Sequence, residues 1–102
     1  MTTSYQTQSS TPIHIPTPLR KFTGGHATIG AQGDTVGDAL DDLTQQFPVL
    51  KQHLYNDEGV LRSFVNVYRN DEDIRYLDGE NTPLAVTDTL SIVPSIAGGC
   101  LD

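Results

Sequence analysis

The chain has 102 residues, of which 36% are hydrophobic, and this length accommodates one small domain. Its formal net charge is −7, from 13 acidic against 6 basic residues, which disfavours binding to nucleic-acid phosphates or to an anionic membrane surface. No apolar run approaches the roughly 20 residues of a membrane-spanning helix. Residues 1–12 lack the pattern of a secretory signal peptide, so we expect a cytoplasmic protein.

The first third of the chain predicts a polar arm followed by a β-hairpin. Residues 1–12 are mostly Ser, Thr and Gln, and we expect them to form a disordered arm. The segment 13–19 is apolar and β-branched but contains Pro16 and Pro18, which predicts an irregular first strand. Apolar residues then alternate along 26–31, as they do in a half-buried second strand.

A helix is the clearest element that the sequence predicts. Thr35, with Asp38 three residues later, resembles a capping box. Pro48 ends the helix at Phe47, and residues 49–55 predict a short second helix. Apolar residues at helical spacing form one stripe that we expect to face the core: Val36, Ala39, Leu40, Leu43 and Phe47.

The second half of the chain predicts three more strands. Residues 62–69 are rich in aromatic and β-branched side chains, and their apolar groups on both faces indicate a central strand. After a polar turn at 70–73, residues 74–77 predict a short strand that pairs back, and residues 90–96 predict the last strand. The order β-β-α-β-β-β predicts an α+β fold in which a mixed sheet of four to five strands packs on one main helix.

The segment after the last predicted strand has an unusual composition. Gly98 and Gly99 are followed by Cys100-Leu101-Asp102, so we divide the chain into the arm 1–12, a domain over 13–97 and a flexible tail over 98–102. A Gly-Gly pair near a chain end also fits a frayed terminus. However, glycine has no Cβ, so an extended Gly-Gly segment can pass through a narrow channel and bring its backbone close to a ligand.

Together with this tail, the element order resembles the ubiquitin-like β-grasp sulfur carriers of the MoaD/ThiS family. Residues 64–75 resemble the central hairpin of that family, and residues 87–99 resemble its last strand and tail. The opening at 15–20, with Thr23-Gly24-Gly25 after it, resembles the branch that carries sulfur for cysteine biosynthesis. The resemblance spans residues 13–99.

The resemblance implies a carrier protein and not an enzyme. In the family, a ubiquitin-activating-type adenylyltransferase uses ATP to adenylate the carboxylate of the terminal glycine. Sulfur transfer then leaves a thiocarboxylate that donates sulfur to a synthase. By this resemblance Gly99 carries the sulfur, Gly98 lets the tail thread into the activating site, and the carrier itself binds no cofactor.

The sequence departs from the family pattern after Gly99. While Cys100-Leu101-Asp102 is attached, Gly99 has an amide bond and no carboxylate that could be adenylated. The family implies a remedy, a JAMM-type zinc peptidase that cuts after Gly-Gly, and we therefore predict cleavage between Gly99 and Cys100. The alternative is that the extension blocks carrier function and that the domain has another role.

The sequence also bears on other functional classes. The single cysteine excludes an iron–sulfur ferredoxin, which needs about four cysteine ligands. His14, His26 and His53 have no metal-ligand spacing, and we assign no metal and no catalytic residue. Two alternatives stay open. One is a sulfur carrier for molybdopterin or thiamine synthesis, and the other is a ubiquitin-like protein-interaction module or modifier whose Gly99 is joined to a lysine.

Overall fold

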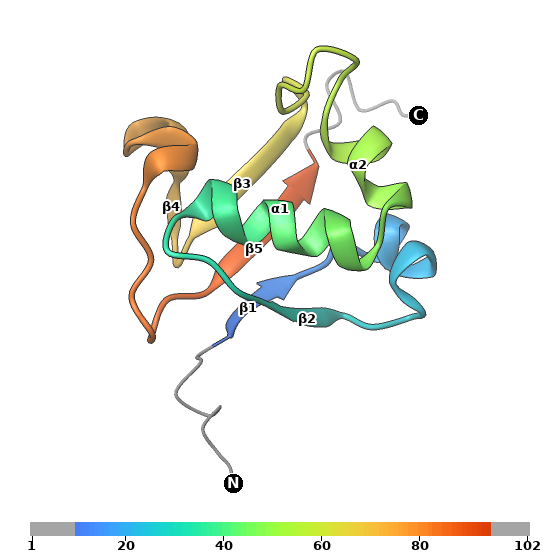
Figure 1. The fold of residues 1–102 in the computed structure, drawn as a ribbon, viewed down its shortest axis with the longest axis horizontal. Coiled ribbons are helices and arrows are strands. Elements are labelled where there is room, and N and C mark those ends of the chain that lie inside the picture. The colour runs from blue at the N-terminus through green and yellow to red at the C-terminus, as the bar shows by residue number, and fades with distance from the viewer. Residues whose placement is uncertain (1–9, 95–102) are drawn as a thin grey trace, which may run out of the picture.

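A five-stranded mixed sheet forms one layer of the protein, and the helices cover one face of it (Figure 1). This is a computed structural model, and it describes residues 10–94; the predictions for Gly98, Gly99 and Cys100 lie outside that range. The strands in spatial order are β2 (Thr28–Ala31), β1 (Thr11–His14), β5 (Leu90–Pro94), β3 (Val65–Arg69) and β4 (Glu72–Asp73). The predicted α+β architecture is confirmed.

Strand β5 lies at the centre of the sheet. It pairs in parallel with β1, where Ile13 is opposite Leu90, and antiparallel with β3, where Val67 is opposite Ile92. Strand β2 pairs antiparallel with β1, as the predicted hairpin requires. The last described strand is therefore held by neighbours on both sides.

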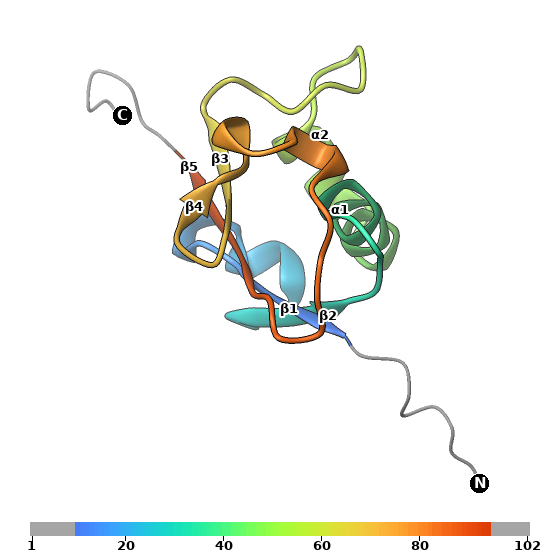
Figure 2. The same ribbon diagram turned by 90° about the vertical axis from the view of Figure 1, so that its left-hand side faces the viewer.

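The hydrophobic core lies between the sheet and α1 (Val36–Gln46), with α2 (Val49–Leu54) closing one end. Figure 2 shows both helices on the same side of the sheet. The first four residues of the predicted stripe are fully buried, whereas Phe47 packs against the core from its edge. The sheet contributes its inward-facing residues: Ile13, Ile29, Ala31, Val65, Val67, Leu90 and Ile92.

The predicted helix start is confirmed at Thr35. Its side-chain oxygen accepts a hydrogen bond from the backbone N–H of Asp38 at 3.2 Å, which satisfies one of the unpaired donors of the first turn. At the other end, Phe47 is the C-cap residue of α1, and Pro48 separates α1 from α2.

The first strand differs from its prediction in place and length. It begins at Thr11, inside the range expected for the arm, and ends at His14 instead of reaching residue 19. Residues Thr17–Thr23 form the 3-10 helix η2, with Pro18 in its first turn. Proline cannot donate to a sheet ladder, but its fixed φ suits the first turn of a helix, so the prolines end the strand and start η2.

The predicted strand over 74–77 is wrong. The pairing strand is β4, two residues earlier, and Ile74–Tyr76 form a short 3-10 helix. The carboxylate of Asp73 accepts a hydrogen bond from the backbone N–H of Arg75 at 2.8 Å. This bond caps the 3-10 helix and favours a turn over a continued strand. Within residues 10–94, no helix is long and apolar enough to cross a membrane.

Candidate functional site

The described part of the predicted site is the strand that leads into the tail. Gly98, Gly99 and the predicted cleavage bond to Cys100 lie outside residues 10–94. Strand β5 ends at Pro94, which lies opposite Val65 of β3. Because β5 is the central strand and pairs with β1 and β3, the part of the chain that leads to Gly99 begins at a strand that is hydrogen-bonded on both sides.

A small polar network fixes the start of β5. One carboxylate oxygen of Asp88 accepts from the backbone N–H of Ala85 at 2.8 Å, and the other accepts from Asn70 Nδ2 at 3.0 Å. The Asn70 side-chain oxygen in turn accepts from the N–H of Thr89 at 3.1 Å. The hydrogen bond from the Ala85 N–H and, to a smaller extent, the one from Asn70 Nδ2 stabilise the charged carboxylate. They therefore lower the pKa of Asp88 below its ordinary value.

The face of the sheet away from the helices is partly open. Residues directly opposite one another on β3 and β5 share this face, namely Asn66 with Val93 and Tyr68 with Ser91. Together they define the outer face: Asn66, Tyr68, Ser91 and Val93. Val93 is 45% exposed, and a shallow hollow of about 310 Å³ lies beside it. The outer face can therefore receive a partner next to the tail.

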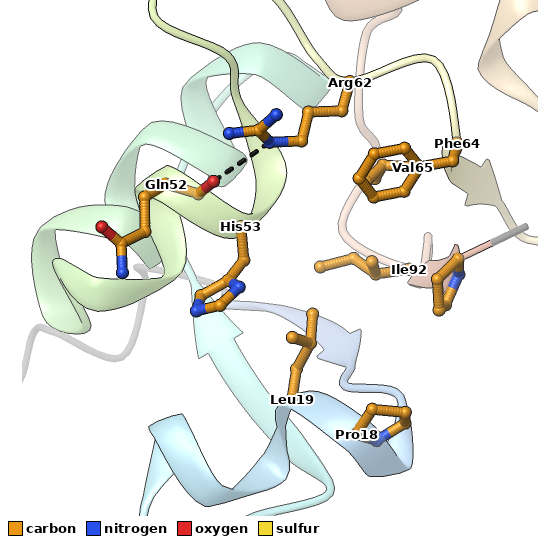
Figure 3. Close-up of a pocket in the computed structure, with 9 residues that line it drawn as sticks. Pro18, Leu19, Gln52, His53, Arg62, Phe64, Val65 and Ile92 are labelled. Carbon is orange, nitrogen blue, oxygen red and sulfur yellow. Dashed lines mark hydrogen bonds between the residues drawn. The ribbon is translucent and has the colours of Figure 1, made fainter. Parts of the chain in front are cut away.

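A second hollow, of about 340 Å³, lies at the end of β5 (Figure 3). We call it the tail hollow, because Pro94 is one of its lining residues. Figure 3 shows the apolar side chains of Leu19, Phe64 and Ile92 around it. They come from η2, from the segment before β3 and from β5.

The rim of the tail hollow carries polar and basic groups. Arg62, one of the lining residues, donates a hydrogen bond from Nε to the backbone carbonyl of Gln52 at 3.0 Å, which holds its guanidinium against α2 (Figure 3). His53 lies beside it, and its ring stacks on Phe22 with centroids 4.4 Å apart. An apolar floor with a basic rim suits a group that is apolar with an acidic end.

A third hollow, of about 370 Å³, is polar and lies at the start of α1. Asp38, Asp41 and Glu80 line it together with Tyr55. Burial of the phenol raises the pKa of Tyr55, and the negative charges of Glu80 and Asp41 raise it further. This hollow is therefore an acidic environment.

The histidines lie apart from one another in the structure. His14 Nδ1 is 3.2 Å from the Thr28 hydroxyl, and His53 is stacked as described above. Among residues 10–94, no group of three or more His, Cys, Asp or Glu side chains could hold a metal ion.

The sequence does not predict the tail hollow. Leu19, His53 and Arg62 come from three separate segments, so no spacing in the sequence relates them. The only signal was that Phe64 and Pro94 are apolar residues within predicted strands, which is equally true of a core residue.

Comparison with known proteins places these features in a family. Residues 13–99 match the ThiS family. The sulfur carrier protein CysO of Mycobacterium tuberculosis is 40% identical over 89 residues, which cover 85% of this chain and 96% of CysO. The chain in the crystal structure of the Amycolatopsis orientalis BexX/CysO complex is also 40% identical, with a TM-score of 0.80 over 88% of this chain and 100% of that chain.

A relative of another kind also matches. Small archaeal modifier protein 1 of Haloferax volcanii is 40% identical over 72 residues, which cover 70% of this chain and 78% of that protein. The resemblance to the β-grasp carriers is thus confirmed by sequence and by fold.

Proposed function

The chain belongs to the ThiS family of ubiquitin-like sulfur carriers, which are carriers rather than enzymes, and on this premise we propose that its Gly99 carries sulfur as a thiocarboxylate. The observation that carries the proposal is the position of Gly99. The family match ends at this residue, which is the second glycine of the Gly98-Gly99 pair.

The chemistry that we propose follows from the poor reactivity of a carboxylate toward nucleophiles. A ubiquitin-activating-type adenylyltransferase joins the Gly99 carboxylate to the α-phosphate of ATP and releases pyrophosphate. Sulfide (HS⁻) then attacks the acyl carbon, the bond to the AMP phosphate oxygen breaks, and loss of the sulfur-bound proton leaves a thiocarboxylate and AMP. Gly98 lets the backbone enter the narrow activating site because it has no Cβ. ATP is bound by the enzyme and not by the carrier.

Residues 100–102 must leave before this reaction. Gly99 gains a carboxylate only when the Gly99–Cys100 amide is hydrolysed. We propose that a JAMM-type zinc peptidase performs this cleavage. The sulfur then passes to a synthase that makes cysteine, and the identity to CysO and the opening at residues 15–20 support this pathway.

A second candidate function is that of a protein modifier. The 40% identity to a small archaeal modifier protein supports it. In this function the activated Gly99 would form an amide with a lysine of a target protein instead of a thiocarboxylate. Both functions need the same trimming and the same adenylation, so they differ only in the last nucleophile.

Intact mass of the protein purified from its native host distinguishes these functions. We expect a chain that ends at Gly99 with one oxygen replaced by sulfur. Attachment of the trimmed chain to lysines of other proteins would favour the modifier. A mass that always ends at Asp102 would contradict both.

Two variants sharpen this experiment. Gly98→Val should be trimmed or adenylated poorly, because its side chain obstructs the channel. Cys100→Ser keeps both glycines and changes only a residue that is removed, so it should give the same thiocarboxylate as the natural sequence. A loss of product in Cys100→Ser would show that the thiol takes part in the reaction, contrary to our proposal.

A further inference from the structure

We propose that the tail hollow is a docking site for a partner protein, and that the partner fills it with an aliphatic side chain whose neighbouring residue is Asp or Glu. This surface goes beyond the proposed function, because it is defined by the chemistry of its occupant and not by the reaction at Gly99.

The floor of the tail hollow offers apolar surface that the core does not cover. Six of its nine lining residues are apolar. Among them Phe64 is 47% exposed, and Leu19 is only partly buried against the core. A single exposed apolar side chain is ordinary, but apolar side chains grouped around a hollow of about 340 Å³ are typical of a binding site. An aliphatic side chain placed there would remove apolar surface from water on both molecules.

The charge around this floor is opposite to that of the whole chain. The chain has 13 acidic and 6 basic residues, yet none of the residues that line the tail hollow is Asp or Glu. Three other hollows of similar volume each have at least one acidic lining residue. One of them, of about 340 Å³, lies between β3 and the 3-10 helix η4 (Gly79–Asn81) and is lined by Glu80. Of these four hollows, the tail hollow is therefore the one that can receive a carboxylate without a carboxylate already in its wall.

Arg62 supplies a positive charge that a carboxylate can pair with. Its hydrogen bond to the Gln52 carbonyl holds the guanidinium against α2, so the charge is in position before a partner binds. Among residues 10–94 the one ion pair joins Arg75 to Asp73, so no described carboxylate pairs with Arg62. Because a guanidinium can bind a carboxylate through two parallel hydrogen bonds, Arg62 is well suited to an acidic residue of a partner.

An aromatic pair extends the basic rim. The ring of His53, which lines the tail hollow, stacks on Phe22, and Lys21 Nζ lies 5.2 Å from the centroid of the same Phe22 ring. A lysine is therefore close to this edge of the hollow. Positive charge beside an apolar floor favours an aliphatic side chain with a carboxylate next to it, because both groups of such an occupant find their match.

The place of the tail hollow in the fold favours a protein as its occupant. Pro94 lines the hollow and ends β5, the strand from which the sequence continues to Gly99. A protein that recognises the carrier at this end must hold its folded body, and the strongest contacts of interfaces are side chains of one partner in pockets of the other. In a protein segment, neighbouring residues bring the aliphatic side chain and the carboxylate to the hollow together.

Nuclear magnetic resonance titration of the full chain with two matched peptides tests this chemistry. The probe is N-acetyl-Ala-Leu-Asp-Ala-amide, and in the comparison peptide Asn replaces Asp. We expect the probe to shift the amide signals of Leu19, His53 and Phe64 until they saturate, with a dissociation constant in the millimolar range. The Asn peptide should bind about fivefold more weakly, because it keeps the aliphatic side chain but loses a partly exposed ion pair. Absence of shifts at these residues, or equal affinity of the two peptides, would overturn the proposal.

Two variants and one matched control identify the contacts. Arg62→Gln should reduce the affinity of the probe to that of the Asn peptide, whereas Phe64→Ala should weaken the binding of both peptides. Lys51→Gln also removes one positive charge, but Lys51 lines the acidic hollow at the start of α1, so it should change neither affinity. Equal weakening of the probe by Arg62→Gln and Lys51→Gln would indicate general attraction between charges and would overturn the assignment to the tail hollow.

Other occupants give different results. If the same amide signals shift when the chain is diluted without peptide, a second copy of the chain occupies the hollow, and the proposal is wrong. Tighter binding of N-acetylleucine than of the probe would identify a small carboxylic acid as the occupant and would also overturn it.

The intact-mass experiment separates this docking site from the proposed function. Probe binding as expected, by a chain whose mass always ends at Asp102, would uphold the docking site and contradict the proposed function. A thiocarboxylate at Gly99 in a chain that does not bind the probe would have the opposite meaning.

Discussion

Asp88 links the charge of one side chain to the start of the central strand. Its carboxylate accepts from Ala85 and Asn70, and these bonds lower its pKa. A lowered pKa in the folded state means that the charged form stabilises the fold at neutral pH. This contribution is present above the ordinary value of 3.8 and is lost as pH falls through the lower folded value.

We therefore expect Asp88→Ala to lower the free energy of unfolding at pH 7 by about 0.5–1.5 kcal/mol, the usual net value of a lost hydrogen bond. The difference from the natural sequence should shrink toward pH 3 as the natural carboxyl group is protonated. Urea unfolding at both pH values measures it. Asp57→Ala, in an exposed loop, is the control and should show neither effect. A difference that stays constant with pH would contradict the assignment.

Gly33 is required because its backbone lies very close to α1, and not because of its backbone φ angle. A Cβ at this position would lie 2.5 Å from the backbone nitrogen of Ala39 and 2.6 Å from Asp38 Cβ. Because these atoms belong to the first turns of α1, they cannot move aside without shifting the helix. We expect Gly33→Ala to destabilise the protein by about 1–3 kcal/mol in urea unfolding. Gly30→Ala, where a Cβ would meet only the Ser10 side chain at 3.1 Å, should cost less.

At the scale of elements, α1 depends on its cap. The Thr35 hydroxyl oxygen accepts from the N–H of Asp38, so Thr35→Ala should cost about 1 kcal/mol of stability. Thr35→Ser keeps the accepting oxygen and should cost clearly less. Thermal unfolding followed by far-ultraviolet circular dichroism measures both. An equal loss in the two variants would mean that the methyl group of Thr35 matters and the cap does not.

The same helix shows why some elements could be predicted from the sequence. Val36, Leu40 and Leu43 repeat at the period of a helix over eleven residues, and a cap and a proline mark its ends. Residues 74–77 offered only a four-residue segment in which Ile74 is β-branched and Tyr76 is aromatic. There a single side-chain hydrogen bond, from the Arg75 N–H to Asp73, decided the local structure.

The candidate site also has one part that the sequence could predict and one part that it could not. The Gly98-Gly99 pair is contiguous, so the sequence alone was enough to predict a role for it, and that role stays a prediction because both residues lie outside residues 10–94. The tail hollow is assembled from Leu19, His53 and Arg62, which only the packing of η2, α2 and the segment before β3 brings together. Because no periodicity or spacing in the sequence relates residues of these three segments, the tail hollow could not be predicted.

At the scale of the whole molecule, the two faces of β5 have different roles. Leu90 and Ile92 point into the core, and Leu90 is fully buried between β1 and β3. Val93 lies on the outer face, 45% exposed, on the strand that leads to Gly99. An enzyme that acts on Gly99 must hold the body close to the tail, and Val93 is the apolar residue of β5 on the outer face that lies nearest to the tail.

The last prediction separates these roles. Val93→Asp should leave the unfolding temperature nearly unchanged, because the side chain is half exposed, but should lower the rate of Gly99 adenylation by about tenfold, a loss typical of one central interface residue. Pyrophosphate release by the adenylyltransferase, with the chain ended at Gly99 as substrate, measures that rate. Val86→Asp makes the same change at a site that is 74% exposed in the loop before β5, and it should leave the rate unchanged. Leu90→Ala, by contrast, should lower stability by about 2–5 kcal/mol, because it removes a fully buried side chain from the central strand. If Val93→Asp and Val86→Asp slow adenylation equally, added negative charge and not the outer face governs the encounter.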